Sequence, residues 1–141
     1  MKFLITGANG QLGQELQKLL RERGLDFVAF DSKQLDITNS AAVLSAFEQE
    51  QPDVVLHAAA YTKVDLAEDD GRELNWQVNV DGTKNVADAA KLYEAKLVAV
   101  STDYVFDGTN EGEYLESDAV NPKNSYGRAK LAGELAVTES G

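Results

Sequence analysis

The chain has 141 residues, the length of one domain, and with 43% apolar and 26% charged residues it is expected to fold around one core. Its 13 basic residues stand against 24 acidic ones, and the net charge of −11 disfavours binding to a nucleic acid backbone. The chain has no cysteine, which excludes disulfides and thiolate metal sites, and its first apolar run is too short for a secretory signal or a membrane span. We therefore expect a cytoplasmic protein with no nucleic acid or membrane partner.

Apolar patterning predicts that strands and helices alternate along the chain. Short apolar runs predict strands at 2–6, 26–30, 54–57 and 96–101. Helix-forming stretches occupy 11–23, 40–50, 71–93 and 125–139. Gly24 closes the first helix and Pro52 cannot continue the second, while 107–124 is rich in Gly, Asn, Asp and Pro and is expected to be a loop.

Four strands joined by helical connections predict a parallel sheet with helices on both faces, which is a doubly wound α/β fold. Right-handed crossovers favour the strand order 3-2-1-4, with the change of direction between strands 1 and 4. Ligands of such folds bind at the carboxyl ends of the strands, beside that change of direction. The candidate functional residues all fall at those ends.

The first of these candidates are the glycines of the segment GANGQLG, namely Gly7, Gly10 and Gly13. Glycine at this spacing permits a tight turn, close approach of the backbone to a pyrophosphate, and close packing of helix on strand. The N-terminus of the following helix would stabilise the phosphate charge. The alternative is a glycine-rich turn that binds nothing.

Asp31 follows the second strand, where a carboxylate accepts hydrogen bonds from the ribose hydroxyls of an adenosine. This arrangement suits NADH, whereas a 2′-phosphate would be repelled by the carboxylate. Lys33 lies near enough to offset that repulsion, so NADPH and NADH both remain open. The alternative for Asp31 is a solvated loop aspartate.

Tyr126 and Lys130 are four positions apart, so a helix places them on one face. A neighbouring ammonium stabilises a phenolate and lowers the phenol pKa, which suits a proton-transfer group. Thr102 follows the fourth strand, and its hydroxyl can hydrogen-bond a substrate carbonyl that the tyrosine protonates. Tyr-x-x-x-Lys also arises by chance, and Thr102 has the alternative of capping a turn.

Other polar and aromatic residues favour structural roles. His57, the only histidine, is expected to be packed or hydrogen-bonded rather than a metal ligand, and Glu15 to be a solvated helix carboxylate, so no metal site is predicted. The acidic residues around the start of the third helix are expected at the surface; they are Glu68, Asp69, Asp70 and Glu73. Trp76 is expected to pack its helix or an interface built from it, which leaves a homodimer open.

The whole chain resembles the extended short-chain dehydrogenase/reductases, and among them the dTDP-4-dehydrorhamnose reductases. Five segments carry the resemblance in order and spacing: GANGQLG at 7–13, LDIT at 35–38, AAAYTKVDLAE at 58–68, STDYVFDG at 101–108 and NPKNSYGRAKLAGE at 121–134. Related epimerases and dehydratases share the glycine loop and the Tyr-Lys pair, but the segment STDYVFDG resembles the reductase branch.

The resemblance implies a Rossmann-like NAD(P)-binding domain and a reaction. In that family NADPH or NADH reduces the 4-keto group of dTDP-4-dehydro-β-L-rhamnose to dTDP-β-L-rhamnose, and Thr102, Tyr126 and Lys130 would be catalytic, with Tyr126 as the proton donor. The implied cofactor contacts are Gly10, Gln11 and Leu12 at the phosphates, Asp36 and Ile37 at the adenine, and Ala60, Tyr61 and Thr62 toward the nicotinamide ribose. The predicted set of cofactor residues is completed by Gly7, Gly13, Asp31 and Ala58, together with Tyr126 and Lys130. Asp103 and Tyr104, with Thr102, would contact the dTDP-sugar.

Members of that family continue beyond this length into a smaller C-terminal substrate domain. Residues 1–141 are therefore expected to be an NAD(P)-binding domain that is incomplete at its C-terminal end, with the substrate domain missing. We expect such a piece to bind NAD(P)H weakly and to turn over poorly, because the substrate lacks its second wall. A non-catalytic dinucleotide-binding regulatory subunit and another nucleotide-sugar epimerase or dehydratase remain as alternatives.

Overall fold

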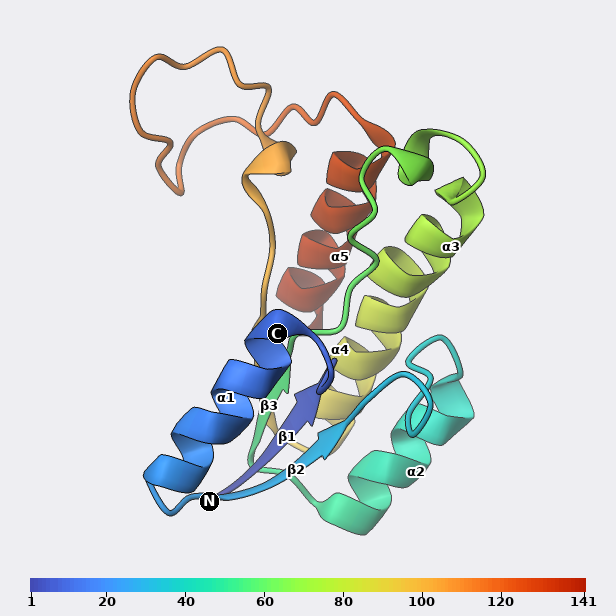
Figure 1. Cartoon of the computed structure of the whole chain (residues 1–141), viewed down its shortest axis with the longest axis vertical. Coiled ribbons are helices and arrows are strands. Elements are labelled where there is room, and N and C mark those ends of the chain that lie inside the picture. Colours follow the sequence, from blue (N-terminus) through green and yellow to red (C-terminus); the bar gives the residue numbers. More distant parts are fainter.

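The computed structural model describes all residues, 1–141, as a four-stranded parallel sheet with helices on both faces (Figure 1). The strands are β1 (Lys2–Thr6), β2 (Asp26–Phe30), β3 (Val54–His57) and β4 (Lys96–Ala99). The helices are α1 (Gln11–Glu22), α2 (Ser40–Glu50), α3 (Arg72–Trp76), α4 (Thr83–Leu92) and α5 (Ser125–Ser140). Two 3-10 turns, η1 (Leu66–Glu68) and η3 (Asp103–Val105), and a π-helical turn, η2 (Gln77–Gly82), complete the elements.

The order of the strands is β2-β1-β3-β4, so the predicted order 3-2-1-4 is wrong. After β2 the chain runs back through α2, passes β1, and forms β3 on its other side. The change of direction therefore lies between β1 and β3. A right-handed crossover can run either way across a sheet if its helix packs on the matching face, and here α1 covers one face while α2 and α4 cover the other (Figure 1).

The main core lies between the sheet and the helices α2 and α4. Leu4 of β1 and Val55 of β3 are register partners, and both are completely buried. They pack in one cluster with Val43 and Phe47 of α2 and Val86 of α4. Removal of these side chains from water stabilises this face of the sheet.

Local signals set most helix ends where the sequence predicts them. α1 is followed by Gly24 in the left-handed conformation at φ 63°, and α2 ends directly before Gln51 and Pro52. The predicted long helix 71–93 forms as α3 and α4 with the π-helical turn η2 between them. α5 begins after Asn124, whose side chain accepts a hydrogen bond from the Gly127 N–H at 2.7 Å.

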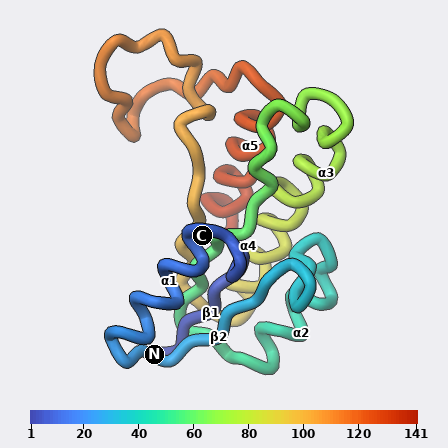
Figure 2. The backbone as a smooth tube through the Cα atoms, viewed as in Figure 1, coloured from blue at the N-terminus to red at the C-terminus, as the bar shows by residue number.

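The four strands end level with one another, and the segments that follow them share one edge of the sheet. Thr6 pairs with Phe30 on one side and His57 on the other, and His57 pairs with Ala99. The irregular segment 107–124 projects beyond this edge, as the orange part of the backbone trace shows (Figure 2). No helix combines the length and the hydropathy needed to cross a membrane.

Candidate functional site

The glycine loop between β1 and α1 has no room for side chains at two positions. Gly7 has φ 74°, and a Cβ there would lie 2.7 Å from the backbone of Ala58 and Ala59. A Cβ at Gly13 would collide with the carbonyl oxygen of Gly7, so glycine is what allows α1 to pack on the end of β1. Gly10 has only one close neighbour, which leaves this part of the loop open to a ligand.

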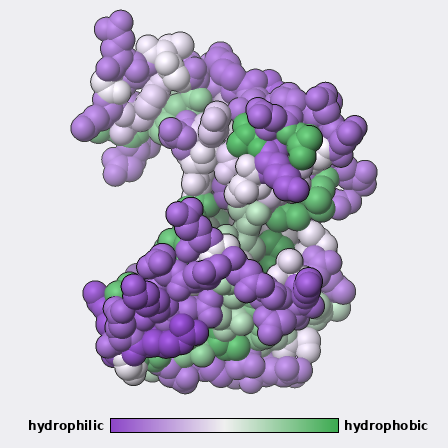
Figure 3. All heavy atoms as spheres, viewed as in Figure 1, coloured by the Kyte–Doolittle hydropathy of each residue, from purple (hydrophilic) through white to green (hydrophobic).

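Two adjoining cavities cross this loop, of about 290 Å³ and 460 Å³. They share Gly10 and the segment 58–60, so together they form one groove over the start of α1, in the region where the surface is hollowed (Figure 3). Among the predicted cofactor residues, the first cavity alone is lined by Gly7, Asp31, Asp36, Ile37 and Tyr61. The second alone is lined by Gln11, Leu12, Gly13, Thr62, Tyr126 and Lys130. All the predicted cofactor residues thus line the groove, although Tyr61 lines the first cavity and Thr62 the second.

The backbone at the start of α1 offers unpaired donors to this groove. The N–H groups of Gln11, Leu12 and Gly13 donate to no acceptor within the chain, and no side chain caps the helix. Such N–H groups carry the positive end of the helix dipole. This terminus can therefore bind an anion between the two halves of the groove.

The Asp31 carboxylate is held by three donors at the end of β2. Its Oδ1 accepts from the N–H groups of Lys33 and Gln34, each at 2.9 Å, and its Oδ2 accepts from the Asn9 amide at 2.7 Å. The sequence did not single out Asn9, which ties the glycine loop to this carboxylate. Asp31 consequently presents a fixed negative charge to the first cavity.

Tyr126 and Lys130 lie on one face of α5, as predicted, and are largely buried at 8% and 9% exposed. The Lys130 ammonium donates to the carbonyl oxygen of Val100 at 2.7 Å. Burial raises the pKa of the Tyr126 phenol, with the nearby Thr102 hydroxyl acting in the opposite direction, and burial lowers the pKa of Lys130. The pKa of the phenol is therefore raised and not lowered as expected, because burial dominates and the Lys130 ammonium is not among the groups that shift it.

Thr102 lies beside Tyr126 and also caps the turn η3. Its Oγ1 accepts a hydrogen bond from the Tyr104 N–H at 3.2 Å and donates to Asp103 at 3.3 Å. The Tyr104 ring meets the Tyr126 ring edge to face, with centroids 5.7 Å apart. A Cβ at Gly127 would collide with the Tyr104 carbonyl oxygen, so this glycine allows η3 to approach α5. Asp103 and Tyr104 line a separate cavity of about 430 Å³ next to the loop 107–124.

His57 is a buried, hydrogen-bonded residue, which confirms the expectation. Its Nδ1 lies 2.7 Å from the Thr6 hydroxyl and its Nε2 lies 3.1 Å from the Thr83 hydroxyl. Burial, and secondarily the positive charge of Lys130, lowers the pKa of His57 to about 4. The imidazole is therefore neutral at physiological pH, and it lines the second cavity of the groove.

Three polar residues near the site were assigned wrongly or overlooked in the sequence. Glu68 was expected to be a solvated acid, but it is half-buried and its carboxylate accepts the N–H of Ser125, the residue before Tyr126. Asn75 and Asn79 are each only 1% exposed and were overlooked. Their spacing of one helical turn could have indicated that the two amides lie on one face of the helix. Trp76, expected to pack its helix or an interface built from it, is 49% exposed in this chain, so the interface alternative stays a prediction.

The comparisons with known proteins agree with this geometry. A dTDP-4-dehydrorhamnose reductase of Burkholderia thailandensis is 45% identical over 141 residues, which is 100% of this chain and 47% of that protein. The crystal structure of a dTDP-4-dehydrorhamnose reductase from Clostridium acetobutylicum has a TM-score of 0.95 and 46% identity, and the match covers 99% of this chain and 49% of that one. The corresponding enzyme from Bacillus anthracis, in complex with NADP, has a TM-score of 0.94 and 47% identity, over 98% of this chain and 49% of that one.

The chain spans about half the length of the curated relatives that it matches. The model of the family described as RmlD substrate binding domain matches residues 1–141. Since that match takes in every residue from the glycine loop to the end of α5, this protein belongs to the RmlD substrate binding domain family.

Proposed function

We propose that this chain is the NAD(P)H-binding part of a dTDP-4-dehydrorhamnose reductase and carries its proton donor. The reaction is reduction of the 4-keto group of dTDP-4-dehydro-β-L-rhamnose to dTDP-β-L-rhamnose. The observation that supports this most directly is the position of Tyr126 and Lys130, which face the second half of the groove beside Thr102. The sugar nucleotide is inferred from similar relatives, which are dTDP-4-dehydrorhamnose reductases.

The groove fits a dinucleotide by its shape and by its donors. Two cavities meet at the start of α1, where the N–H groups of Gln11 and Leu12 are free to bind the pyrophosphate. We place the adenosine half in the cavity with Asp31, Asp36 and Ile37, and the nicotinamide half in the cavity with Tyr126. A relative in complex with NADP supports NADPH as a cofactor. NADH remains a second candidate, because the Asp31 carboxylate can accept hydrogen bonds from ribose hydroxyls.

The residues of the second cavity divide the chemistry between them. NADPH or NADH supplies the hydride that adds to C4 of the sugar. The Tyr126 hydroxyl donates its proton to the carbonyl oxygen, so a hydride and a proton together convert the ketone into an alcohol. The raised pKa of Tyr126 keeps the phenol protonated at neutral pH, which is the form that a proton donor requires.

Thr102 and Lys130 assist Tyr126 from either side. The Thr102 hydroxyl hydrogen-bonds the same carbonyl oxygen and orients it, as Asp103 and Tyr104 hold the sugar nearby. The ammonium of Lys130 stabilises the negative charge that the tyrosine carries after it has given up its proton. The protein then returns to its starting state by taking a proton from water.

The test is oxidation of NADPH and NADH by dTDP-4-dehydro-L-rhamnose. We would compare this chain with a form extended to the length of its relatives, and include Tyr126→Phe in the longer form. Activity that is strong in the extended protein, weak in this chain and absent from Tyr126→Phe supports the proposal. An extended protein that binds cofactor but never oxidises it with a 4-keto sugar nucleotide would instead be a regulatory subunit, and turnover without net oxidation would indicate an epimerase.

A further inference from the structure

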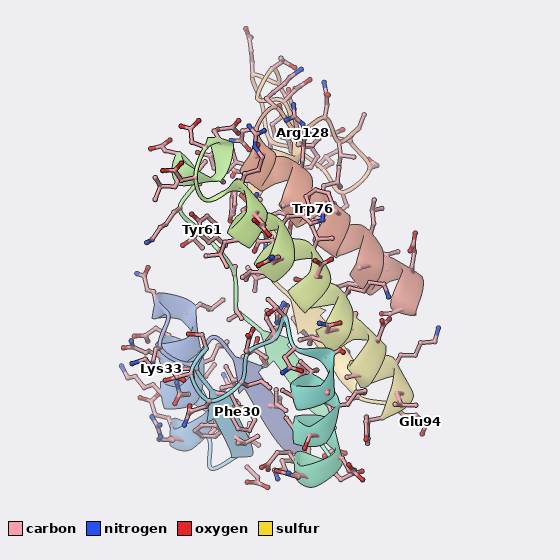
Figure 4. The ribbon with its side chains drawn as sticks, turned by 90° about the vertical axis from the view of Figure 1, so that its right-hand side faces the viewer. Phe30, Lys33, Tyr61, Trp76, Glu94 and Arg128 are labelled. Atoms are coloured by element: carbon pink, nitrogen blue, oxygen red, sulfur yellow. The ribbon has the colours of Figure 1, made fainter.

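Ser125, the residue before Tyr126, is held on both sides of its backbone by side chains from a distant part of the chain. Its N–H donates to Oε1 of Glu68 at 2.5 Å, and its carbonyl oxygen accepts from the Asn75 amide at 3.2 Å. Glu68 belongs to η1 and Asn75 to α3. The first turn of α5 is therefore fixed relative to α3, which lies alongside it near Trp76 and Arg128 (Figure 4).

Glu68 is a well-supported acceptor for this bond. The Ser125 N–H is the main cause that lowers the pKa of Glu68, and the positive charges of Arg72 and Arg128 act in the same direction. Arg72 also donates to the Glu68 carbonyl oxygen at 2.6 Å, and the Gly71 N–H donates to Leu66, which closes the turn that carries the carboxylate. The carboxylate is thus ionised and fixed at neutral pH.

Asn75 connects Ser125 to the groove. Its Oδ1 accepts from the Asn79 amide at 2.8 Å. Asn79 in turn binds the backbone of Tyr61 twice, donating to its carbonyl oxygen at 2.9 Å and accepting from its N–H at 3.0 Å. A continuous chain of hydrogen bonds therefore runs from the groove segment at Tyr61 to the backbone beside Tyr126.

The hydrogen bonds from Glu68 and Asn75 to Ser125 are not needed to cap α5. Asn124 already caps α5 through the Gly127 N–H, so the helix has its local cap without Glu68 or Asn75. The two additional bonds come from residues far away in sequence, and neither residue lines either half of the groove. Their geometric effect is to set how α5 is rotated and placed, and hence where the phenol of Tyr126 points.

We propose that Glu68 and Asn75 are positioning residues that hold the Tyr126 hydroxyl in register with the groove. This inference rests on the proposed function, because it concerns the residue assigned as proton donor. Loss of either bond leaves the cofactor contacts in place and moves the proton donor. A displacement of about 1 Å at a catalytic group lowers turnover by up to about a hundredfold.

The test uses a protein of the relatives' full length that contains this chain. Glu68→Gln keeps the reach and an acceptor oxygen but loses the charge, whereas Glu68→Asp keeps the charge and loses the reach. We expect Glu68→Gln to retain most of kcat, and Glu68→Asp and Asn75→Ala to lose about tenfold or more with KM for NADPH nearly unchanged. Glu73→Gln is the matched control, because Glu73 is an exposed carboxylate of the same segment that bonds only Gln77, and it should match the wild type.

The outcomes separate this inference from the proposed function. A fall in kcat confined to Glu68→Asp and Asn75→Ala, in variants with wild-type circular dichroism, supports the positioning role. The positioning role is overturned if Glu68→Asp keeps full kcat, or if Glu68→Gln loses more kcat than Glu68→Asp. If Tyr126→Phe is inactive in the same assay, the proposed function stands even though the positioning role has failed. A fully active Tyr126→Phe overturns both.

Discussion

The Lys130 ammonium and the Val100 carbonyl oxygen are joined by a hydrogen bond of 2.7 Å that ties α5 to the segment after β4. The ammonium is therefore engaged by the backbone, while burial dominates the environment of the neighbouring Tyr126 phenol. Tyr126 and Lys130 therefore do not behave as a phenol whose pKa is set by a neighbouring ammonium, and a titration of Tyr126 can measure this.

We expect Tyr126 to titrate above the ordinary value of 10.0 in this chain without cofactor, because burial disfavours the phenolate. Thr102→Ala should move the titration higher still, since the Thr102 hydroxyl lowers the pKa. The measurement is an NMR titration with labelled tyrosine, and Tyr126→Phe identifies the signal. A midpoint near neutral pH would show that Lys130 controls the phenol after all.

His57 should make the free energy of unfolding depend on pH. Its pKa is about 4 in the folded chain against an ordinary 6.5, so only the unfolded chain takes up the proton between these values. Stability is then unaffected by His57 above about pH 6.5 and falls as the pH drops from 6.5 toward 4, by about 3 kcal/mol at the lower end. Urea unfolding of wild type and His57→Gln at neutral pH and pH 4 should show a smaller loss in the variant, and equal losses would contradict the prediction.

Gly13→Ala should weaken NADPH binding by about tenfold or more, which corresponds to 1.4 kcal/mol. The added Cβ collides with the Gly7 carbonyl oxygen and displaces the start of α1, with the N–H groups of Gln11 and Leu12. Gly24→Ala is the control, because its Cβ meets nothing within 4 Å and its positive φ costs only about 1 kcal/mol of stability. Fluorescence titration with NADPH separates the two, and equal affinities in both variants would rule out the phosphate-binding role.

Asp31→Asn should shift cofactor preference toward NADPH. Removal of a negative charge near the 2′ position relieves repulsion of about 1 kcal/mol, or about a fivefold change in the ratio of the two Kd values. The asparagine can still accept hydrogen bonds from Lys33 and Gln34, so the turn should persist. Asp118→Asn, in the loop 107–124 away from the groove, serves as the control, and an unchanged ratio in Asp31→Asn would place the 2′ position elsewhere.

The sequence predicted what depends on neighbours along the chain. Gly24 and Pro52 end helices for steric reasons that act within a few residues, and both helices end where predicted. The glycine spacing likewise located the loop, because Gly13 approaches the Gly7 carbonyl oxygen within the same turn. The Ala58 backbone that Gly7 approaches lies on a distant segment and was not predictable in this way.

The remaining features depend on contacts between distant residues. Apolar runs predict strands, but the position of β3 beside β1 follows from the face on which α2 packs, which periodicity does not specify. Composition likewise suggested a solvated Glu68, since its partner Ser125 lies on another helix. The spacing of Asn75 and Asn79 shows that their side chains lie on one face of a helix. It does not show that these side chains bind the backbone of Ser125 and Tyr61.

Because the four strands end level with one another, the segments that follow them can change in sequence without a change in the sheet. Apolar residues within the strands fix the register that aligns Thr6, Phe30, His57 and Ala99, and the polar contacts of the site come mainly from segments beyond them. Sequence change in those segments can therefore alter selectivity while the hydrophobic framework is inherited intact. Asp103 and Tyr104, which follow the proposed catalytic residue Thr102, are where we expect lineages that reduce different sugars to accumulate their differences.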